Sequence, residues 1–312
     1  MKILIVNGIF NLKFDENNLN GLTRPMKHLR DALAEKYTVK LLSYGGDNMQ
    51  ECKDVYTREI KNYSPDAIIN FENSLTDILF ETNVKLFRYI LTVPQLNKLP
   101  KGPHQIPWEE KMAKDNNSYL VFCSNAHLKS TERNFFKLNR KKFICFLSSP
   151  MIDLKNYSHE EILNHNGNMI TFCRADKLKK PFLGNELFSN SICFIPEKND
   201  YYEKNKIGKI NIGYKHEMIM NELRKSKFSI IHAAPYDSFI STVVESGVRG
   251  IPILSTDIID EFNPIYDAYP DWAYFSTDCN FTLNDRIKLS EVIREKYSQN
   301  NFLNQWLKIL KI

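Results

Sequence analysis

The stretch that decides the fold is Phe228–Ser255, FSIIHAAPYDSFISTVVESGVRGIPILS. It begins with the apolar run FSII, ends with the similar run IPILS, and carries a helix-like pattern between them. This order of strand, loop, helix and strand is typical of a parallel sheet. Asp237 then lies in the loop after the first strand, and Glu245, eight residues later, lies near the start of the following helix. Both acids are expected near the carboxyl edge of the sheet, where open α/β sheets bind ligands.

Similar β-prone runs alternate with helical patterns along the whole chain, which predicts parallel sheets with crossover helices. The predicted strands are Lys2–Val6, Val39–Leu42, Ala67–Asn70, Leu86–Leu91, Tyr119–Cys123, Phe143–Leu147, Met169–Cys173, Ile192–Ile195, Ile210–Ile212, Phe228–Ile231 and Pro252–Leu254. The clearest helical patterns are Thr23–Lys36 and His127–Lys137, and the tail Asn284–Ile312 is also helical by spacing.

The polar segment Ser148–Asn168, broken by Pro150, is the predicted joint between two α/β halves. We expect an N-terminal domain over residues 1–150, a C-terminal domain over 151–290 and a helical segment over 291–312. Two such halves imply an interdomain cleft, which is a preferred place for ligand sites.

Composition restricts the class of protein. The 312 residues are 43% apolar and 25% charged, as is usual for a globular chain of two domains. The first residues read as a strand rather than a signal peptide, and no apolar run approaches a membrane span. The six cysteines form no C-x-x-C pair and are expected as buried free thiols in a reducing cytoplasm. The net charge of +5 fits a polyanionic acceptor, an anionic donor or a membrane surface.

The second half contains three motifs that suit a nucleotide sugar. In ITFCRADKLKKP, Arg174 follows a strand and Lys179 comes five residues later, so the two cations can clamp a diphosphate. In NIGYKHEMIMNEL, Gly213 ends a short strand before a helix. The third motif is the Asp237 and Glu245 stretch, in which the carboxylate of Glu245 can accept the two hydroxyls of a ribose.

Two glycines follow Glu245, and both have a predicted role at the same site. Gly247 and Gly250 are expected to let the backbone approach the ligand closely, because glycine has no side chain.

In this order and spacing the second half resembles the C-terminal domain of retaining GT-B glycosyltransferases of the GT4 type. The resemblance implies two Rossmann-like domains facing across a deep cleft, with C-terminal helices packing back toward the first domain. It implies that Arg174 and Lys179 bind the donor diphosphate, that Glu245 binds the ribose and that Asp237 lies by the sugar. Asp237 stands where the family has Glu. Lys180 stands where the family usually has Gly, so either lysine can make the diphosphate contact.

Within GT-B enzymes the chain is also similar to the phage DNA glucosyltransferases, which modify 5-hydroxymethylcytosine. The Asp237-x-Phe239-Ile240 run, the Arg-x4-Lys spacing and the Gly…Gly…Ile-Pro run carry this similarity. It implies a cytoplasmic enzyme of an infected bacterial host, with double-stranded DNA as its partner and a UDP-sugar as co-substrate.

In the first half the resemblance points to the loops after the strands. Gly21 precedes a helix whose N-terminal amides can face a phosphate, as a glycine-containing loop does in the family. Candidates for the acceptor side are Glu72, Thr92, Gln95 and His104. The histidine that the family often places after one of these strands is absent there, and His104 lies in the next loop.

The densest basic stretch is His127–Lys142, HLKSTERNFFKLNRKK. Lys129 and Arg133 belong to it and are candidates for contact with the phosphates of a DNA acceptor. A solvated helix face and a membrane-facing amphipathic helix are the alternatives.

The leading hypothesis is a glycosyltransferase acting on hydroxymethylated pyrimidines in DNA. The sequence has no D-x-D motif and no helical histidine pair, so no metal ligand and no required cofactor are predicted. Retention would need no protein base, whereas inversion would assign that role to Glu72. The alternatives are a lipid-linked or surface saccharide acceptor, and a non-catalytic GT-B-fold binding protein. The identity of the sugar and the oligomeric state are left open.

Overall fold

The protein is described by a computed structural model, in which the chain divides into two compact units. The first unit comprises 1–150 and 299–312, and the second comprises 151–298. The residues that the structure describes are 1–7, 14–16, 23–44, 48–71, 75–90, 106–134, 142–144, 167–173, 175–177, 179–213, 216–232, 241–255, 259–273 and 281–311. The tail expected over 291–312 is divided between the two units.

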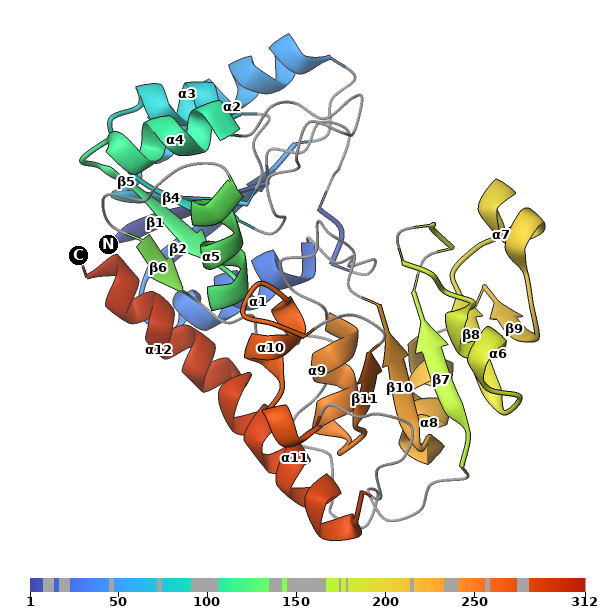
Figure 1. Ribbon diagram of the computed structural model, residues 1–312. Coiled ribbons are helices and arrows are strands. Elements are labelled where there is room, and N and C mark those ends of the chain that lie inside the picture. The colour runs from blue at the N-terminus through green and yellow to red at the C-terminus, as the bar shows by residue number, and fades with distance from the viewer. Residues whose placement is uncertain are drawn as a thin grey trace. The chain divides into compact units, whose positions relative to one another are not determined.

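The first unit is built on a six-stranded parallel sheet with the order β2-β1-β3-β4-β5-β6 (Figure 1). Its strands are β1 Lys2–Asn7, β2 Thr38–Ser43, β3 Ala67–Asn70, β4 Lys85–Ile90, β5 Ser118–Phe122 and β6 Lys142–Ile144. The chain enters at β1, moves to β2 on one side, and then crosses to β3 on the other. The direction of winding therefore reverses between β1 and β3.

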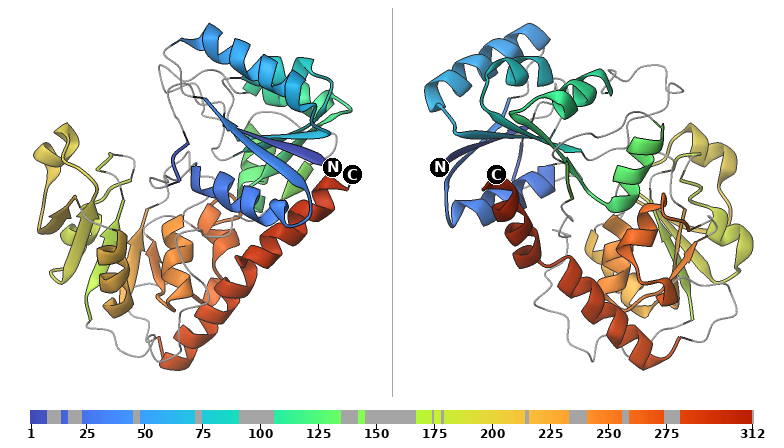
Figure 2. Two further views of the ribbon diagram at one scale, coloured as in Figure 1. Left: turned by 180° about the vertical axis from the view of Figure 1, so that it is seen from behind. Right: turned by 60° about the vertical axis from the view of Figure 1, so that its left-hand side comes forward.

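Helices cover both faces of this sheet. They are α1 Thr23–Ala34, α2 Met49–Tyr63, α3 Thr76–Glu81, α4 Ile106–Lys114, α5 Asn125–Asn134 and α12 Gln299–Leu310. Figure 1 places α2, α3 and α4 on one face, and Figure 2 shows α1 and α12 side by side on the other. The C-terminal helix α12 belongs to the first unit, which confirms the expectation that C-terminal helices pack back toward the first domain.

The alternation of side chains along each strand explains these layers. Leu4, Ile68 and Leu120 belong to a core cluster with residues of α2, α3 and α4. Their neighbours along the strands point to the other face, where Phe87 and Tyr89 meet the fully buried Trp306 of α12 edge to face.

The second unit contains a five-stranded parallel sheet with the order β11-β10-β7-β8-β9. Its strands are β7 Met169–Phe172, β8 Ser191–Ile195, β9 Lys209–Ile212, β10 Phe228–Ile231 and β11 Ile253–Ser255. Here the winding reverses between β7 and β10. The strand–helix–strand order predicted from Phe228–Ser255 is confirmed by β10, α9 and β11.

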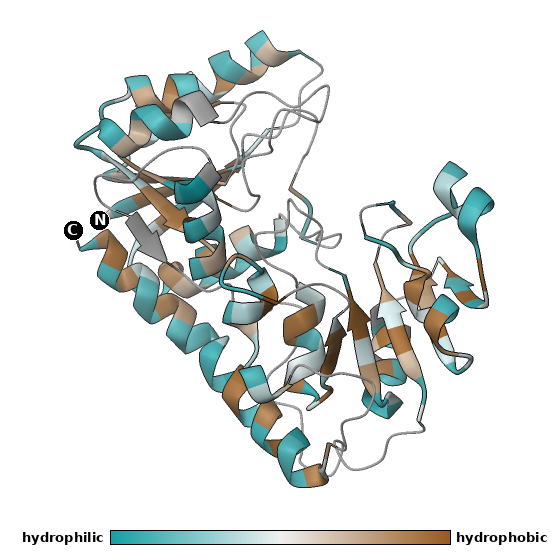
Figure 3. Ribbon diagram, viewed as in Figure 1, coloured by the Kyte–Doolittle hydropathy of each residue, from teal (hydrophilic) through white to brown (hydrophobic). Residues whose placement is uncertain are grey.

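The helices of this unit are α6 Leu183–Leu187, α7 Asp200–Asn205, α8 His216–Lys225, α9 Ser241–Val248, α10 Pro264–Ala268 and α11 Leu283–Lys296. Ile219 and Leu223 of α8 pack with Ile170 on one sheet face, and Phe182 and Tyr202 pack with residues such as Cys193 on the other. Figure 3 shows β10 and β11 as mainly hydrophobic and α7 as mainly hydrophilic, as expected for two buried strands and an outer helix.

Local signals fix several helix ends. Asn48 accepts a hydrogen bond from the Glu51 amide at the start of α2, and Thr282 and Asp285 form a reciprocal capping box at the start of α11.

Among the described residues, no helix is long and apolar enough to span a membrane. Cys52, Cys123 and Cys193 are buried free thiols, and Cys173 is half-buried.

Candidate functional site

The strand order of the second sheet reverses between β7 and β10, and each of these strands is followed by a segment that carries a predicted site residue. Lys179 is in the segment that follows β7, and Glu245 is on the helix that follows β10. β7 and β10 are neighbours in the sheet. Open α/β sheets bind ligands outside the carboxyl ends of the strands at such a reversal. The topology therefore brings the two segments to the place where a ligand site is expected.

Lys179 lies in a tight turn. Its amide and that of Lys180 both donate to the Asp176 carbonyl, at 3.1 and 3.2 Å. Lys179 is half-buried, whereas Lys180 is exposed and has a φ of 42°. Glycine adopts this left-handed conformation without steric strain, and other residues do not. The backbone thus explains why the GT4 resemblance implies a glycine at position 180.

Glu245 is the fifth residue of α9, and only 2% of its surface is exposed. It lies in the second turn of the helix rather than at its start, which corrects the position inferred from the sequence. Its backbone carbonyl accepts a hydrogen bond of 2.9 Å from Nη1 of the buried Arg249. Burying a carboxylate is costly unless polar groups or a ligand compensate it, so such a residue is a candidate for function.

Gly213 directly follows β9, has a φ of 65° and donates its amide to the carbonyls of Ile195 and Pro196, at 3.2 and 3.1 Å. These bonds tie the carboxyl ends of β8 and β9. Among the described residues, the atom nearest to the position of a Cβ at Gly213 is the Pro196 carbonyl oxygen, at 4.0 Å. The prediction that a strand ends here before a helix is confirmed.

Asn199 is a supporting residue that the sequence interpretation missed. It caps α7 by accepting from the Tyr202 amide, and its Nδ2 donates to the Ala175 carbonyl at 2.7 Å. The segment after β7 is thereby tied to the segment after β8. The signal was available, because asparagine before Asp200 and two tyrosines is a helix-start pattern.

The expected role of Gly247 and Gly250 at the ligand site is wrong. A Cβ at Gly247 would lie 2.7 Å from Cγ1 of Ile293 on α11, and one at Gly250 would lie 2.4 Å from the Arg286 carbonyl oxygen. Gly250 also comes shortly before β11, at the amino edge of the sheet. The two glycines let α9 and the following turn pack closely against α11.

The first sheet has its own reversal between β1 and β3, and both strands end in a buried asparagine. Nδ2 of Asn7 donates to Oγ of Ser43 at 3.0 Å, and the Asn7 carbonyl accepts from the hydroxyl of Tyr56. Nδ2 of Asn70 donates to Oγ1 of Thr76 at 3.3 Å. Burial raises the pKa of Tyr56 to about 12, so this phenol stays neutral. The repeated endings IVN and IIN were the missed signal.

In the first unit, Arg88 and Glu109 form a buried ion pair that sequence patterns also missed. Nε of Arg88 on β4 is 4.0 Å from Oε1 of Glu109 on α4, and both side chains are almost fully buried. Nη1 of Arg88 also donates to the Asn70 carbonyl at 3.4 Å. The pair connects β3, β4 and α4.

Lys129 and Arg133 are exposed on α5, four residues apart, and therefore lie on one face of the helix. His127 on the same helix is buried and meets Phe122 edge to face. Residues 135–141 of the basic stretch lie outside the described residues, and Lys142, its last residue, begins β6.

Several predicted site residues cannot be placed, because they lie outside the described residues. They are Gly21, Glu72, Thr92, Gln95, His104, Arg174 and Asp237. In the described part of the chain, no group of three or more His, Cys, Asp or Glu side chains is arranged to hold a metal.

No protein-family model matches the chain, and no curated protein matches it. Solved structures do. Anabaena HepE in complex with UDP-glucose is 10% identical, with a TM-score of 0.70 over 100% of this chain and 99% of that one. The chain has the GT-B fold. Sucrose-phosphate synthase from Thermosynechococcus elongatus is 8% identical, with a TM-score of 0.69 over 99% and 98% of the two chains. A glycosyltransferase from Rickettsia africae is 15% identical, with a TM-score of 0.62 over 99% and 97%.

Proposed function

We propose that this protein is a glycosyltransferase that uses a nucleotide sugar, most simply a UDP-sugar, as donor. The observation that carries the proposal is that Lys179 follows β7 and Glu245 follows β10. These two strands are neighbours, and the strand order of this GT-B-type sheet reverses between them. The solved structures of the same fold support it, since HepE was solved with UDP-glucose.

The chemistry assigns a role to each residue. The ammonium of Lys179, together with Arg174, would neutralise the charge that develops on the departing diphosphate. The Glu245 carboxylate would accept hydrogen bonds from the ribose hydroxyls. Asp237 would lie by the donor sugar, and the backbone at Gly213 would leave room for the nucleotide. As in retaining GT-B enzymes, this scheme needs no protein base; an inverting reaction would use Glu72 instead.

Nucleotide binding tests the donor site directly. A ligand at about 100 times its Kd should stabilise the folded protein by about 2.7 kcal/mol, so UDP should raise the melting temperature. Lys179→Ala and Glu245→Gln should lose most of this shift. Lys177→Ala removes an exposed lysine two residues away and should keep it. Absence of a shift with UDP, ADP and GDP alike would contradict the donor site and favour a non-catalytic binding protein.

For the acceptor we propose a hydroxymethylated pyrimidine in double-stranded DNA. The exposed face of α5 that carries Lys129 and Arg133 supports a phosphate contact. Each lost phosphate contact should reduce the slope of log K against log salt by about 1, so Lys129→Ala and Arg133→Ala should flatten this dependence. Lys308→Ala, at an exposed lysine on α12, is the control.

A saccharide is the second candidate acceptor, favoured by the likeness to sucrose-phosphate synthase. Transfer of labelled sugar from UDP-sugars should be compared on hydroxymethylated DNA, unmodified DNA and oligosaccharides, with products identified by mass spectrometry. Label on hydroxymethylated DNA alone supports the DNA acceptor. Label on oligosaccharides alone rejects it and keeps the donor chemistry.

A further inference from the structure

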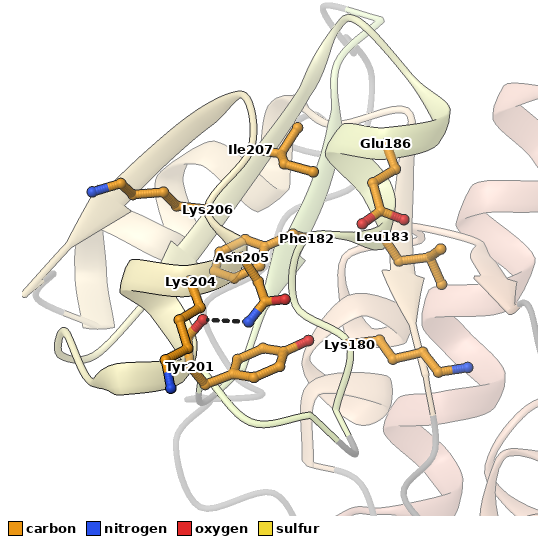
Figure 4. A pocket seen from close by; sticks show the side chains of 9 residues that line it. All are labelled: Lys180, Phe182, Leu183, Glu186, Tyr201, Lys204, Asn205, Lys206 and Ile207. Atoms are coloured by element: carbon orange, nitrogen blue, oxygen red, sulfur yellow. Dashed lines mark hydrogen bonds between the residues drawn. The ribbon is translucent and has the colours of Figure 1, made fainter.

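The second unit contains a pocket of about 300 Å³ between α6 and α7. Figure 4 shows Phe182 and Glu186 on the α6 side and Tyr201 and Asn205 on α7, with Lys180 near the opening. Lys179 and Glu245, which carry the proposed donor site, do not line this pocket. Lys180, the alternative diphosphate contact, is the lining residue that the two sites share.

One wall of the pocket is a rigid aromatic surface. The rings of Phe182 and Tyr201 are nearly parallel, with centroids 6.1 Å apart and an interplanar angle of 11°. Phe182 is buried in a core cluster, while Tyr201 is half-buried and packs against it. Because the two rings stack on each other, a flat base cannot enter between them. An apolar aromatic surface of this kind suits the C–H face of a sugar ring.

The polar groups face the same space. Figure 4 shows the Glu186 carboxylate and the Tyr201 hydroxyl directed into it, with the Asn205 amide next to the Tyr201 ring. In the described part of the chain, the Glu186 side chain has no hydrogen-bond or ion-pair partner. Asn205 is held by its own hydrogen bond, from Nδ2 to the Tyr201 carbonyl at 2.8 Å. Carboxylate, amide and phenol groups together can accept from and donate to several hydroxyls.

Size and charge narrow the ligand further. The volume is at the low end of the range for ligand pockets, about 300–1,000 Å³, which fits one monosaccharide and not a nucleotide. Three lysines line the pocket, and Figure 4 shows the ammonium groups of Lys180, Lys204 and Lys206 directed away from the centre, whereas the Glu186 carboxylate is directed toward it. A central carboxylate repels phosphate, so a neutral polyhydroxylated ligand fits best.

We propose that this pocket binds one sugar residue of a carbohydrate. The inference does not rest on the proposed transfer reaction, because binding requires no chemistry. A polymeric saccharide held here would be retained near the donor site through the raised local concentration of its other units. A positive result would therefore also favour the saccharide acceptor.

Saturation-transfer difference NMR tests the proposal with methyl glycosides of glucose, galactose and N-acetylglucosamine at about 10 mM, a concentration suited to millimolar affinity. Excess UDP is present throughout to block sugar binding at the donor site. At least one glycoside should give ring-proton signals with the wild-type protein. Glu186→Ala and Tyr201→Ala should weaken binding about tenfold.

Glu197→Ala is the matched control, since it removes an exposed carboxylate of the same unit outside the pocket and should keep the signals. Glu186 is exposed, so its variant should fold normally, and the UDP-induced melting shift of each variant reports separately on the donor site. Signals that persist in both pocket variants or that never appear in the presence of UDP would overturn the proposal.

Discussion

The two edges of the second sheet differ in how their glycines are used. At the carboxyl edge, no described atom comes closer than 4.0 Å to the position of a Cβ at Gly213, and its backbone bonds tie β8 to β9. At the amino edge, the backbone at Gly250 is in contact with Arg286 of α11, whose Nε donates to the Gly250 carbonyl at 3.0 Å. Gly250 is therefore enclosed by packing, whereas none of the described residues packs closely against Gly213.

Because of this difference, the two ends of the ESGVRGIP motif have different roles. Glu245 lies in the middle of α9, and Gly250 follows the helix, which ends at Val248. Glu245 and Gly250 therefore belong to one motif but contribute to different edges of the sheet. The experiments below measure how strongly the amino edge depends on close packing and how freely the carboxyl edge tolerates change.

Gly250→Ala should cause the largest loss of stability, about 3 kcal/mol or more, because it combines a φ of 64° with a clash against backbone. Gly213→Ala has the same φ problem without the clash and should cost only about 1 kcal/mol. Urea unfolding of both variants compares them. Equal losses would mean that the packing of α11 does not distinguish the two edges.

Arg286→Met should cost about 2–3 kcal/mol at the amino edge. The guanidinium donates to the Gly250 and Ser226 carbonyls, both at 3.0 Å, just before β11 and β10. Burial lowers the pKa of Arg286 to about 10, so the group is still charged at neutral pH. Thermal unfolding is the measurement, and Lys288→Met on the exposed side of α11 is the control. If both variants lose a similar amount of stability, Arg286 does not stabilise the amino edge specifically.

Tyr269→Phe should cost about 1 kcal/mol, because its hydroxyl donates to the Ile251 carbonyl at 2.8 Å at the same edge. Burial raises the pKa of Tyr269 well above its usual value, so the native state keeps the proton. Stability is then fully present below about pH 10 and is lost as pH rises further. Melting curves from pH 8 to 11 should fall less steeply for Tyr269→Phe. An unchanged slope would show that Tyr269 does not contribute to the alkaline loss.

The elements of both sheets were predictable from sequence because their strands are short apolar runs between helical patterns. Buried runs such as Met169–Phe172 and Phe228–Ile231 need no tertiary information to be recognised. The single helical tail was predicted less well. Spacing cannot reveal that the chain passes from the second unit to the first between Lys296 and Gln299.

The positions of Lys179 and Gly213 after strands were predictable from the sequence, while their roles at a ligand site stay predictions. It was not predictable where the role depends on distant contacts. Gly250 needs to be glycine because of Arg286, which is 36 residues away in the chain. The Arg88 and Glu109 pair is likewise formed by packing, and neither residue has a local pattern that predicts it.

Lys180→Gly should give the smallest effect, a gain of about 0.5–1 kcal/mol, because glycine relieves the left-handed conformation but also loosens the unfolded chain. Lys177→Gly, at a nearby exposed lysine whose φ is not positive, should instead lose stability. UDP affinity should be unchanged in both if Lys179 makes the diphosphate contact. A loss of UDP affinity in Lys180→Gly alone would transfer that contact to Lys180. In that case the carboxyl edge would tolerate less change than its open backbone indicates.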